Sequence, residues 1–284
     1  MLRPHLALPL VLVLSGCPTE PERPVGPAPV QGCGDLAVGT LPADHPGAAT
    51  FDRCVTAFGV PTYAAPDVAD EHLLHVAFVL AEYLDNDEDG VADDPAVVAS
   101  MVSVGAANVV TATQAGYEQF AEAGGFADTI WWQPTAVEEM GTDGEPWFDA
   151  TLEEVLHLVN SAGHSLVYPD AFAERDSLLT DAMDIARGGH FEAVPPSYPA
   201  ASWYHYDDTT CDYACMAIEY LYWALTTQLG AQAASQRCDW ISDEWELCTP
   251  ETLAATDTAV HALLTDPQYS LPTVLPDGVY GAAR

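Results

Sequence analysis

The feature that most constrains this chain is its charge imbalance. Its 284 residues include 43 aspartates and glutamates but only 7 basic residues, all of them arginines. A carboxylate that is buried on folding has to be paired with a cation or bind a metal ion. Because basic residues are so scarce, we expect metal ions to be the partners of buried carboxylates. The same imbalance excludes nucleic-acid binding through phosphate neutralisation and attraction to anionic lipid headgroups.

The N-terminus has the pattern of an export signal. Residues 1–16 contain one arginine, Arg3, then an apolar stretch from Leu6 to Leu14 and small residues before Cys17. This pattern is typical of a cleaved signal peptide, and the stretch is shorter than the roughly 20 apolar residues of a membrane span. Leu14-Ser15-Gly16-Cys17 resembles the lipobox of bacterial lipoproteins. The resemblance implies cleavage before Cys17 and acylation of its thiol. An ordinary signal peptide with a chance cysteine is the alternative.

A proline-rich segment follows the predicted lipidation site. Residues 17–32 contain almost no large apolar side chains, which predicts an extended tether. The lipid would attach the protein to a membrane of the cell envelope. Pro18 stands where some lipoproteins carry the aspartate that marks inner-membrane retention, so the resemblance favours the outer membrane or the cell surface. We expect the folded region to cover residues 33–284, about 250 residues.

The cysteine content predicts disulfides. Six cysteines remain beyond Cys17, and an even number in an exported chain favours oxidised pairs. Neighbours in the sequence suggest Cys33–Cys54 and Cys238–Cys248, with Cys211–Cys215 left over, although six cysteines allow many other connectivities. A zinc–thiolate site is the less favoured alternative outside the cell.

Hydrophobic periodicity and turn signals predict an α+β fold that is mostly helical with a small sheet. Helices are expected over residues 66–84, 95–101, 113–123, 151–162, 175–186, 213–229 and 250–264. Strands are expected at 107–112 and 130–133, the second ended by Pro134, and an extended tail at 271–280. The folded region divides into a helix–loop–helix unit (66–104), a candidate metal-site core (105–230) and a disulfide-bearing C-terminal part (231–284).

The clearest chemical motif is the acidic run from Asp85 to Asp94. Carboxylates at positions 1, 3, 5 and 9, glycine at position 6 and a backbone carbonyl at position 7 have the spacing of a calcium loop. The expected calcium ligands are Asp85, Asp87, Asp89, Val91, Asp93 and Asp94. The run resembles an EF-hand loop, but Ala96 replaces the bidentate glutamate at position 12. We therefore expect weak binding, with Asp94 as the substitute ligand. A solvated acidic turn is the alternative.

A second candidate metal site begins on the predicted helix 151–162. Glu153-Glu154-Val155-Leu156-His157 resembles the His-Glu-x-x-His motif of zincin metallopeptidases, with Glu153 in place of the first histidine. Glu219 lies in an almost entirely apolar predicted helix, where a carboxylate needs a partner. Its position resembles that of the glutamate ligand in gluzincins, a branch of the zincins.

The resemblance implies a zincin-like core and a role for each residue. His157 and Glu219 would bind zinc, with Glu153 or His164 as the remaining ligand. Glu154 would act as the general base on a water molecule at the metal. Tyr206, or its neighbour Tyr204, would polarise the carbonyl of a substrate.

A structural interpretation of these residues is the alternative. Thr151 and Glu154 have the spacing of a capping box, and acids in a first turn favour the helix dipole. His157 and His164 would then be structural histidines, and Glu219 would bond a tyrosine or an arginine.

Two classes of function follow from these motifs. In the first, a lipid-anchored extracytoplasmic protein binds calcium and carries a zinc hydrolase site that cleaves amide bonds. In the second, a non-catalytic, calcium-stabilised surface lipoprotein binds a protein or peptide partner or supports the envelope. The sequence specifies neither the substrate nor the partner.

Overall fold

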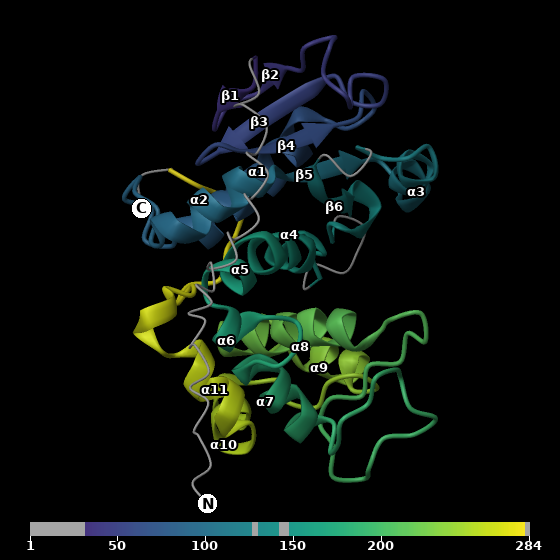
Figure 1. The fold of residues 1–284 in the computed structure, drawn as a ribbon, viewed down its shortest axis with the longest axis vertical. Helices are drawn as coiled ribbons and strands as arrows, with labels where there is room; N and C mark the ends of the chain where they lie inside the picture. The colour runs from purple at the N-terminus through teal and green to yellow at the C-terminus, as the bar shows by residue number, and fades with distance from the viewer. Residues whose placement is uncertain (1–31, 127–129, 142–147, 282–284) are drawn as a thin grey trace, which may run out of the picture.

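The computed structural model describes residues 32–126, 130–141 and 148–281 (Figure 1). The predicted signal segment, Cys17 and residues 18–31 of the predicted tether lie outside this part of the chain. Among the described residues, no helix is both long enough and apolar enough to cross a bilayer.

The architecture is α+β, as the sequence predicts, with a mixed sheet at one end of a mostly helical molecule (Figure 1). The strands are β1 (Gly34–Asp35), β2 (Gly39–Thr40), β3 (Arg53–Ala57), β4 (Val60–Ala64), β5 (Ala106–Thr111) and β6 (Trp131–Ala136). They follow the order β1-β3-β4-β5-β6, and β2 pairs with β3. β3 and β4 are antiparallel, whereas β4, β5 and β6 run parallel.

The first four strands are not predicted from the sequence. β3 is mostly buried along its length, so its residues lack the apolar–polar alternation of a half-exposed strand. The turn between β3 and β4 contains Phe58 and Gly59, both with positive φ. Asn-Gly and Asp-Gly are the usual markers of such a turn, and phenylalanine is not.

β6 continues through Pro134, although a proline at this position predicts the end of a strand. β6 lies at the edge of the sheet and pairs only with β5 among the described strands. A proline is tolerated on an edge strand because its missing N–H need not bond a further strand.

The helices lie before and after α4 (Thr151–Val159) in the chain. Before it come α1 (Asp70–Leu84), α2 (Pro95–Val104) and α3 (Gln114–Glu122). After it come α5 (Ser165–Val167), α6 (Pro169–Phe172), α7 (Leu178–Ala186), α8 (Tyr213–Gln228), α9 (Ser235–Ile241), α10 (Pro250–Thr256) and α11 (Thr258–Leu264). α4 contacts α1 and β6, and it also contacts α8, so it lies between the sheet and the C-terminal helices (Figure 1).

Two predicted helices are interrupted. Residues Asn160–His164 form a π turn directly after α4. The predicted helix 250–264 is divided at Asp257, whose side chain caps α11 by accepting a hydrogen bond from the Val260 amide. The same carboxylate accepts bonds from Trp203 Nε1 and from the Tyr220 hydroxyl. Tertiary contacts therefore fix this break, and local periodicity does not reveal it.

The predicted disulfide pairs are confirmed. The structure joins Cys33 to Cys54, Cys211 to Cys215 and Cys238 to Cys248. The last of these bonds links α9 to the segment that precedes α10.

Candidate metal centre

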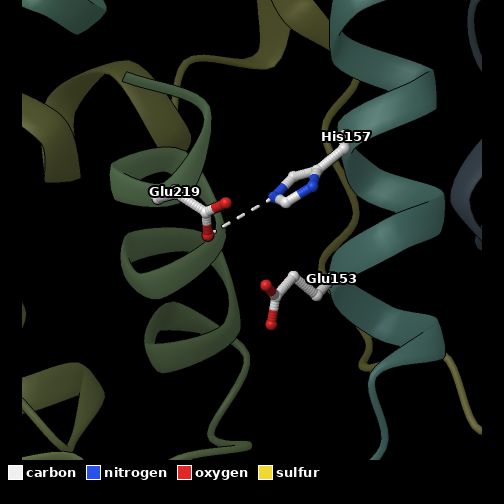
Figure 2. Close-up of side chains that lie close together, drawn as sticks. All are labelled: Glu153, His157 and Glu219. Carbon is white, nitrogen blue, oxygen red and sulfur yellow. Dashed lines mark ion pairs between the residues drawn. The ribbon is translucent and has the colours of Figure 1, made fainter. Parts of the chain in front are cut away.

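Three of the predicted zinc ligands lie together where α4 faces α8 (Figure 2). Glu153 and His157 are one turn apart on the same face of α4, as the i, i+4 spacing requires. Glu219 points toward them from α8. One ligand atom of each residue lies within 4.8 Å of the others. His157 Nε2 is 3.7 Å from Glu219 Oε2.

The Nε2 atom of His157 is buried and has no hydrogen-bond partner among the described residues. The residue is 7% exposed. An unpaired polar atom in such a place is unfavourable, and native structures rarely leave one without a reason. A nitrogen facing two carboxylates, with no hydrogen bond of its own, is the arrangement that a cation would complete.

Glu154 lies on the other side of the imidazole. Its Oε2 is 3.7 Å from His157 Nδ1, and it also accepts a hydrogen bond from Gln133 of β6. Metal-binding histidines usually have a carboxylate or carbonyl at the second ring nitrogen, which fixes the tautomer and the ring orientation. This position suits a residue that orients His157. The role of Glu154 as a general base stays a prediction.

The capping-box alternative is wrong. α4 follows Ala150 and has no side-chain cap, and the Thr151 hydroxyl is buried without a hydrogen-bond partner among the described residues. The backbone N–H of Thr151 instead donates a hydrogen bond to Asp149 Oδ1 at 2.9 Å. Glu153 and Glu154 still lie in the first turn of α4, where acidic side chains favour the helix dipole.

His164 does not join the cluster. The π turn takes more residues per turn than an α-helix, so residues after Val159 rotate off the face that carries Glu153 and His157. The His164 ring is buried beside Phe172, and its Nε2 is 3.3 Å from the carbonyl oxygen of Tyr269. The expectation that His164 lies on the same helix face is corrected by this turn.

The two candidate tyrosines occupy different environments. Tyr204 is fully buried, and its hydroxyl donates to the Met216 carbonyl at 2.7 Å. Tyr206 lines the cavity beside the cluster, where burial raises the pKa of its hydroxyl and the charge of Glu219 adds to this rise. Of the two, Tyr206 is the one that can meet a ligand.

A cavity of about 370 Å³ opens beside Glu153 and Glu219. Its other lining residues are Phe148, Tyr206, Asp207, Trp223, Arg237, Trp240, Ile241, Asp243 and Glu244. Five of the lining residues are acidic, one is an arginine, and three carry large aromatic rings in addition to Tyr206. The residues from Arg237 to Glu244 are not predicted from the sequence, because no motif or spacing connects them to the zincin-like residues on α4 and α8.

The cluster holds more negative charge than the protein alone neutralises. Burial raises the pKa of Glu153 well above its usual range, and the charge of Glu219 adds to this rise. Burial also raises the pKa of Glu219. Burial lowers the pKa of His157, but Glu219 and Glu154 outweigh it and raise the value to about 9. Without a cation the site therefore retains protons, and a metal ion would displace them.

The predicted calcium loop is only partly assembled. α1 ends and α2 begins on either side of it, and ligand oxygens of Asp85, Asp87 and Asp89 lie within 4.8 Å of one another. Asp93 instead accepts a hydrogen bond from the backbone N–H of Asn86 at 2.8 Å. Asp94 caps α2 and accepts a bond from the Tyr168 hydroxyl at 2.6 Å. The structure thus groups three of the predicted ligands.

The extended segment near the C-terminus lies against this loop. The Asn86 side chain accepts bonds from the Thr273 and Val274 amides, both at 2.9 Å. The Tyr280 hydroxyl donates to Asp85, and the Gly281 amide donates to Glu88. The loop and residues 273–281 therefore form one structural unit.

Comparisons of the chain with family models, with curated proteins and with solved structures find no match. The class of protein is defined by its own fold and site: an α+β protein with a buried Glu–His–Glu cluster beside an acidic cavity.

Proposed function

We propose that Glu153, His157 and Glu219 bind a zinc ion and that this centre is the functional site of the protein. The observation that carries the proposal is the buried Nε2 atom of His157, which faces two carboxylates and has no hydrogen bond among the described residues. Imidazole and carboxylate are suitable zinc ligands. The scarcity of basic residues in this chain makes a metal ion the natural partner of these carboxylates.

A hydrolase is the activity that this arrangement supports best. Catalytic zinc sites keep three protein ligands and leave one position for water or substrate, and the metal then supplies Lewis acidity. The cavity beside Glu153 and Glu219 gives a substrate access to that position. Tyr206 lines the same cavity, and its hydroxyl can donate a hydrogen bond to a substrate carbonyl. Glu154, which faces Nδ1, orients His157.

The location and the calcium site belong to the same proposal. We propose that the chain is exported, acylated at Cys17 and held at the cell envelope by residues 17–32. Calcium would bind the loop through Asp85, Asp87 and Asp89. The contacts that Thr273 and Tyr280 of the C-terminal segment make with this loop support a structural role for that ion. If the zinc site has no catalytic activity, a calcium-stabilised surface protein that binds a partner is the second candidate function.

The zinc site is tested by metal content. We would measure zinc on the purified protein after chelator treatment, zinc loading and desalting, in the parent and in His157→Ala, Glu219→Gln and His164→Gln. We expect close to one zinc per chain in the parent and in the His164 variant, because His164 is a buried histidine outside the cluster. The His157 and Glu219 variants should lose most of it. The proposal would be contradicted if the His157 variant retained its zinc or if the parent bound no zinc.

A further inference from the structure

Arg237 is a buried cation of the acidic cavity that forms no ion pair with the described residues, although its charge offsets part of the rise in the pKa of Glu153 and of Glu244. It is 2% exposed and lines the same cavity as Glu153 and Glu219. The other described arginines, Arg53, Arg175 and Arg187, each contact a carboxylate at 2.5 to 2.9 Å. For Arg237, no carboxylate oxygen of the described residues lies within the 4.0 Å of an ion pair. In a chain with 43 acidic residues, this separation needs an explanation.

The guanidinium is held in one orientation by aromatic rings. It stacks at 4.9 Å from the ring of Phe148, 5.3 Å from Trp223 and 4.9 Å from Trp240. Such cation–π contacts stabilise the charge without neutralising it. The planar fork of an arginine that is fixed in this way is prepared to bind an oxyanion.

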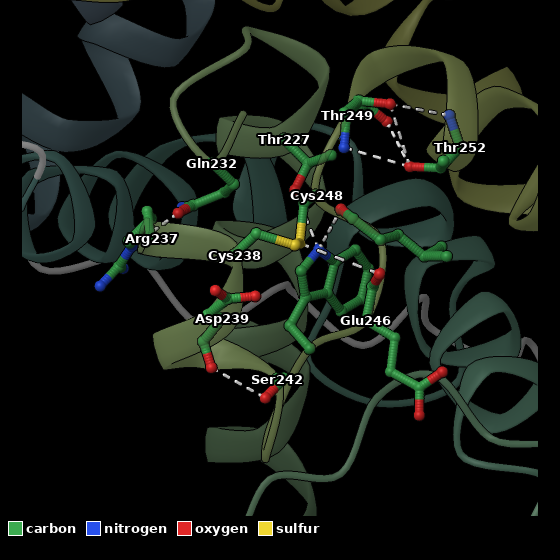
Figure 3. The surroundings of a disulfide bond; sticks show 12 residues. Thr227, Gln232, Arg237, Cys238, Asp239, Ser242, Glu246, Cys248, Thr249 and Thr252 are labelled. Atoms are coloured by element: carbon green, nitrogen blue, oxygen red, sulfur yellow. Dashed lines mark hydrogen bonds between the residues drawn. A yellow bond between two sulfur atoms is a disulfide. The ribbon is translucent and has the colours of Figure 1, made fainter. Parts of the chain in front are cut away.

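Hydrogen bonds use only part of this fork. Nε donates to Gln232 Oε1 at 2.7 Å, and Nη2 donates to the Tyr222 hydroxyl at 3.3 Å (Figure 3 shows Arg237 with Gln232). Nη1 has no hydrogen bond to the described residues. The adjacent disulfide Cys238–Cys248 ties α9 to the following segment and so helps to hold Arg237 at the cavity wall.

The charges around the cavity select among oxyanions. Asp207, Asp243 and Glu244 also line it, so a dianion such as a phosphate monoester would be repelled by several carboxylates. A carboxylate carries a single charge, and its two oxygens match the guanidinium fork. The aromatic rings of Trp223 and Trp240 provide apolar surface beside that group.

We infer that Arg237 is a substrate-binding residue that pairs with a carboxylate of the ligand while the rest of the ligand faces the metal centre. The substrates of this site would then be acyl compounds, such as peptides, that carry a free carboxylate close to an apolar group. This inference rests on the proposed zinc site, because it assigns the substrate class of that same cavity.

The experiment uses three probes and the full purified protein. Isothermal titration calorimetry would measure the binding of 3-phenylpropanoate, of the uncharged 3-phenylpropanamide and of phenyl phosphate to the zinc-loaded protein. We expect the carboxylate to bind at least about tenfold more tightly than the amide or the phosphate, as one charge-assisted pair implies. Equal binding of the carboxylate and the amide by the parent overturns the inference, whatever any variant does.

Two variants assign the effect to Arg237. Arg237→Gln should lose about tenfold or more of the carboxylate affinity, keep the amide affinity and still bind one zinc. Arg175→Gln, which removes an exposed arginine outside the cavity, is the matched control and should behave as the parent. If Arg237→Gln does not fold, Arg237→Lys, which keeps the charge but not the fork, should still bind the carboxylate several-fold more weakly. Undiminished carboxylate binding by a folded Arg237 variant overturns the inference.

The zinc site and the carboxylate site are separate proposals, and comparing zinc content with carboxylate binding, in the zinc-loaded and the metal-free protein, distinguishes them. Zinc binding without any preference for the carboxylate leaves the zinc site standing and removes the role of Arg237. A carboxylate preference that depends on Arg237 in a protein that binds no zinc supports the carboxylate site and removes the zinc centre.

Discussion

His157 is the residue on which the site depends, because both of its ring nitrogens face carboxylates. Nε2 faces Glu219, and Nδ1 faces Glu154, each at 3.7 Å. In the metal-free protein these charges favour the protonated ring and raise the pKa of His157 to about 9 against the effect of burial. Zinc binds only the neutral ring, so binding has to displace this proton.

The pH dependence of zinc binding follows with a definite sign. Because the pKa of His157 is about 9 and that of Glu153 is also raised, zinc must displace at least one proton near pH 7. The apparent zinc affinity should therefore rise as the pH increases toward about 9 and fall as the pH decreases. Calorimetric titrations in buffers with different ionisation enthalpies would count the released protons. A pH-independent affinity with no proton release would contradict this account.

Glu154 is expected to act on zinc through His157. Glu154→Gln removes the negative charge that faces Nδ1, and loss of such an outer partner typically weakens metal binding about 10- to 100-fold. Competition with a chromogenic chelator would measure the change. Glu122→Gln, an exposed site on α3, is the control and should leave the affinity unchanged. If Glu154→Gln removes zinc as completely as His157→Ala does, Glu154 is itself a ligand.

The i, i+4 spacing on one helix predicts that Glu153 and His157 lie on the same helix face. The apolar surroundings of Glu219 predict that its carboxylate needs a partner. The same helical spacing misplaces His164, because a π turn is not visible in a hydrophobic pattern. Arg237 and Glu244 are brought to the cavity by the path of the chain after α8. Their part in the site could not be predicted because it depends on tertiary packing.

At the scale of elements, the loop between α1 and α2 is joined to the C-terminal segment. Asn86 and Glu82 bond the backbone of residues 273–278, and Tyr280 bonds Asp85. An ion that orders the loop would therefore also stabilise the docking of this segment, and the melting temperature would report it.

Calcium is expected to raise the melting temperature. At a calcium concentration about tenfold above Kd, binding to the folded state alone would raise it by about 2–4 °C relative to a chelator. Asp87→Asn should abolish most of this shift, because it removes one of the three grouped carboxylates of the loop. Asp87 is exposed and makes none of the hydrogen bonds to the C-terminal segment described above, so the substitution should leave the docking of that segment intact. Asp67→Asn, an exposed aspartate before α1, should keep the full shift. Identical melting curves with calcium and with chelator would exclude a structural calcium site.

Elements with strong periodicity or clear capping signals are predicted well. The Asp94-Pro95 pair predicts the start of α2, and the structure has Asp94 as its cap. Elements fixed by long-range contacts are not predicted: β1 to β4 depend on pairing within the sheet, and the break at Asp257 depends on Trp203 and Tyr220.

At the scale of the whole molecule, the charge imbalance gives both proposed metal sites a common cause. The described arginines other than Arg237 are each paired with acids, so few cations remain for the carboxylates that folding brings together. The structure gathers acids in the loop after α1 and in the cavity between α4, α8 and α9. Cations from the surroundings would then complete the fold.

The proposed lipid anchor is tested by expressing the full-length chain in a bacterial host. Metabolic labelling with palmitate should modify the parent, and Cys17→Ser should carry no label and appear in the soluble extracytoplasmic fraction. Cys54→Ser, which removes a disulfide cysteine, is the control and should keep the label. Equal labelling of the parent and the Cys17 variant would refute acylation at this residue.

The most direct measurement is crystallographic. Diffraction data from crystals of the zinc-loaded protein, collected above and below the zinc absorption edge, would locate the metal. We predict one anomalous difference peak between α4 and α8, within about 2.0–2.3 Å of His157 Nε2 and of one carboxylate oxygen each from Glu153 and Glu219. A zinc-loaded crystal with no peak at this position, or with a peak that His157 Nε2 does not contact, would contradict the proposed centre.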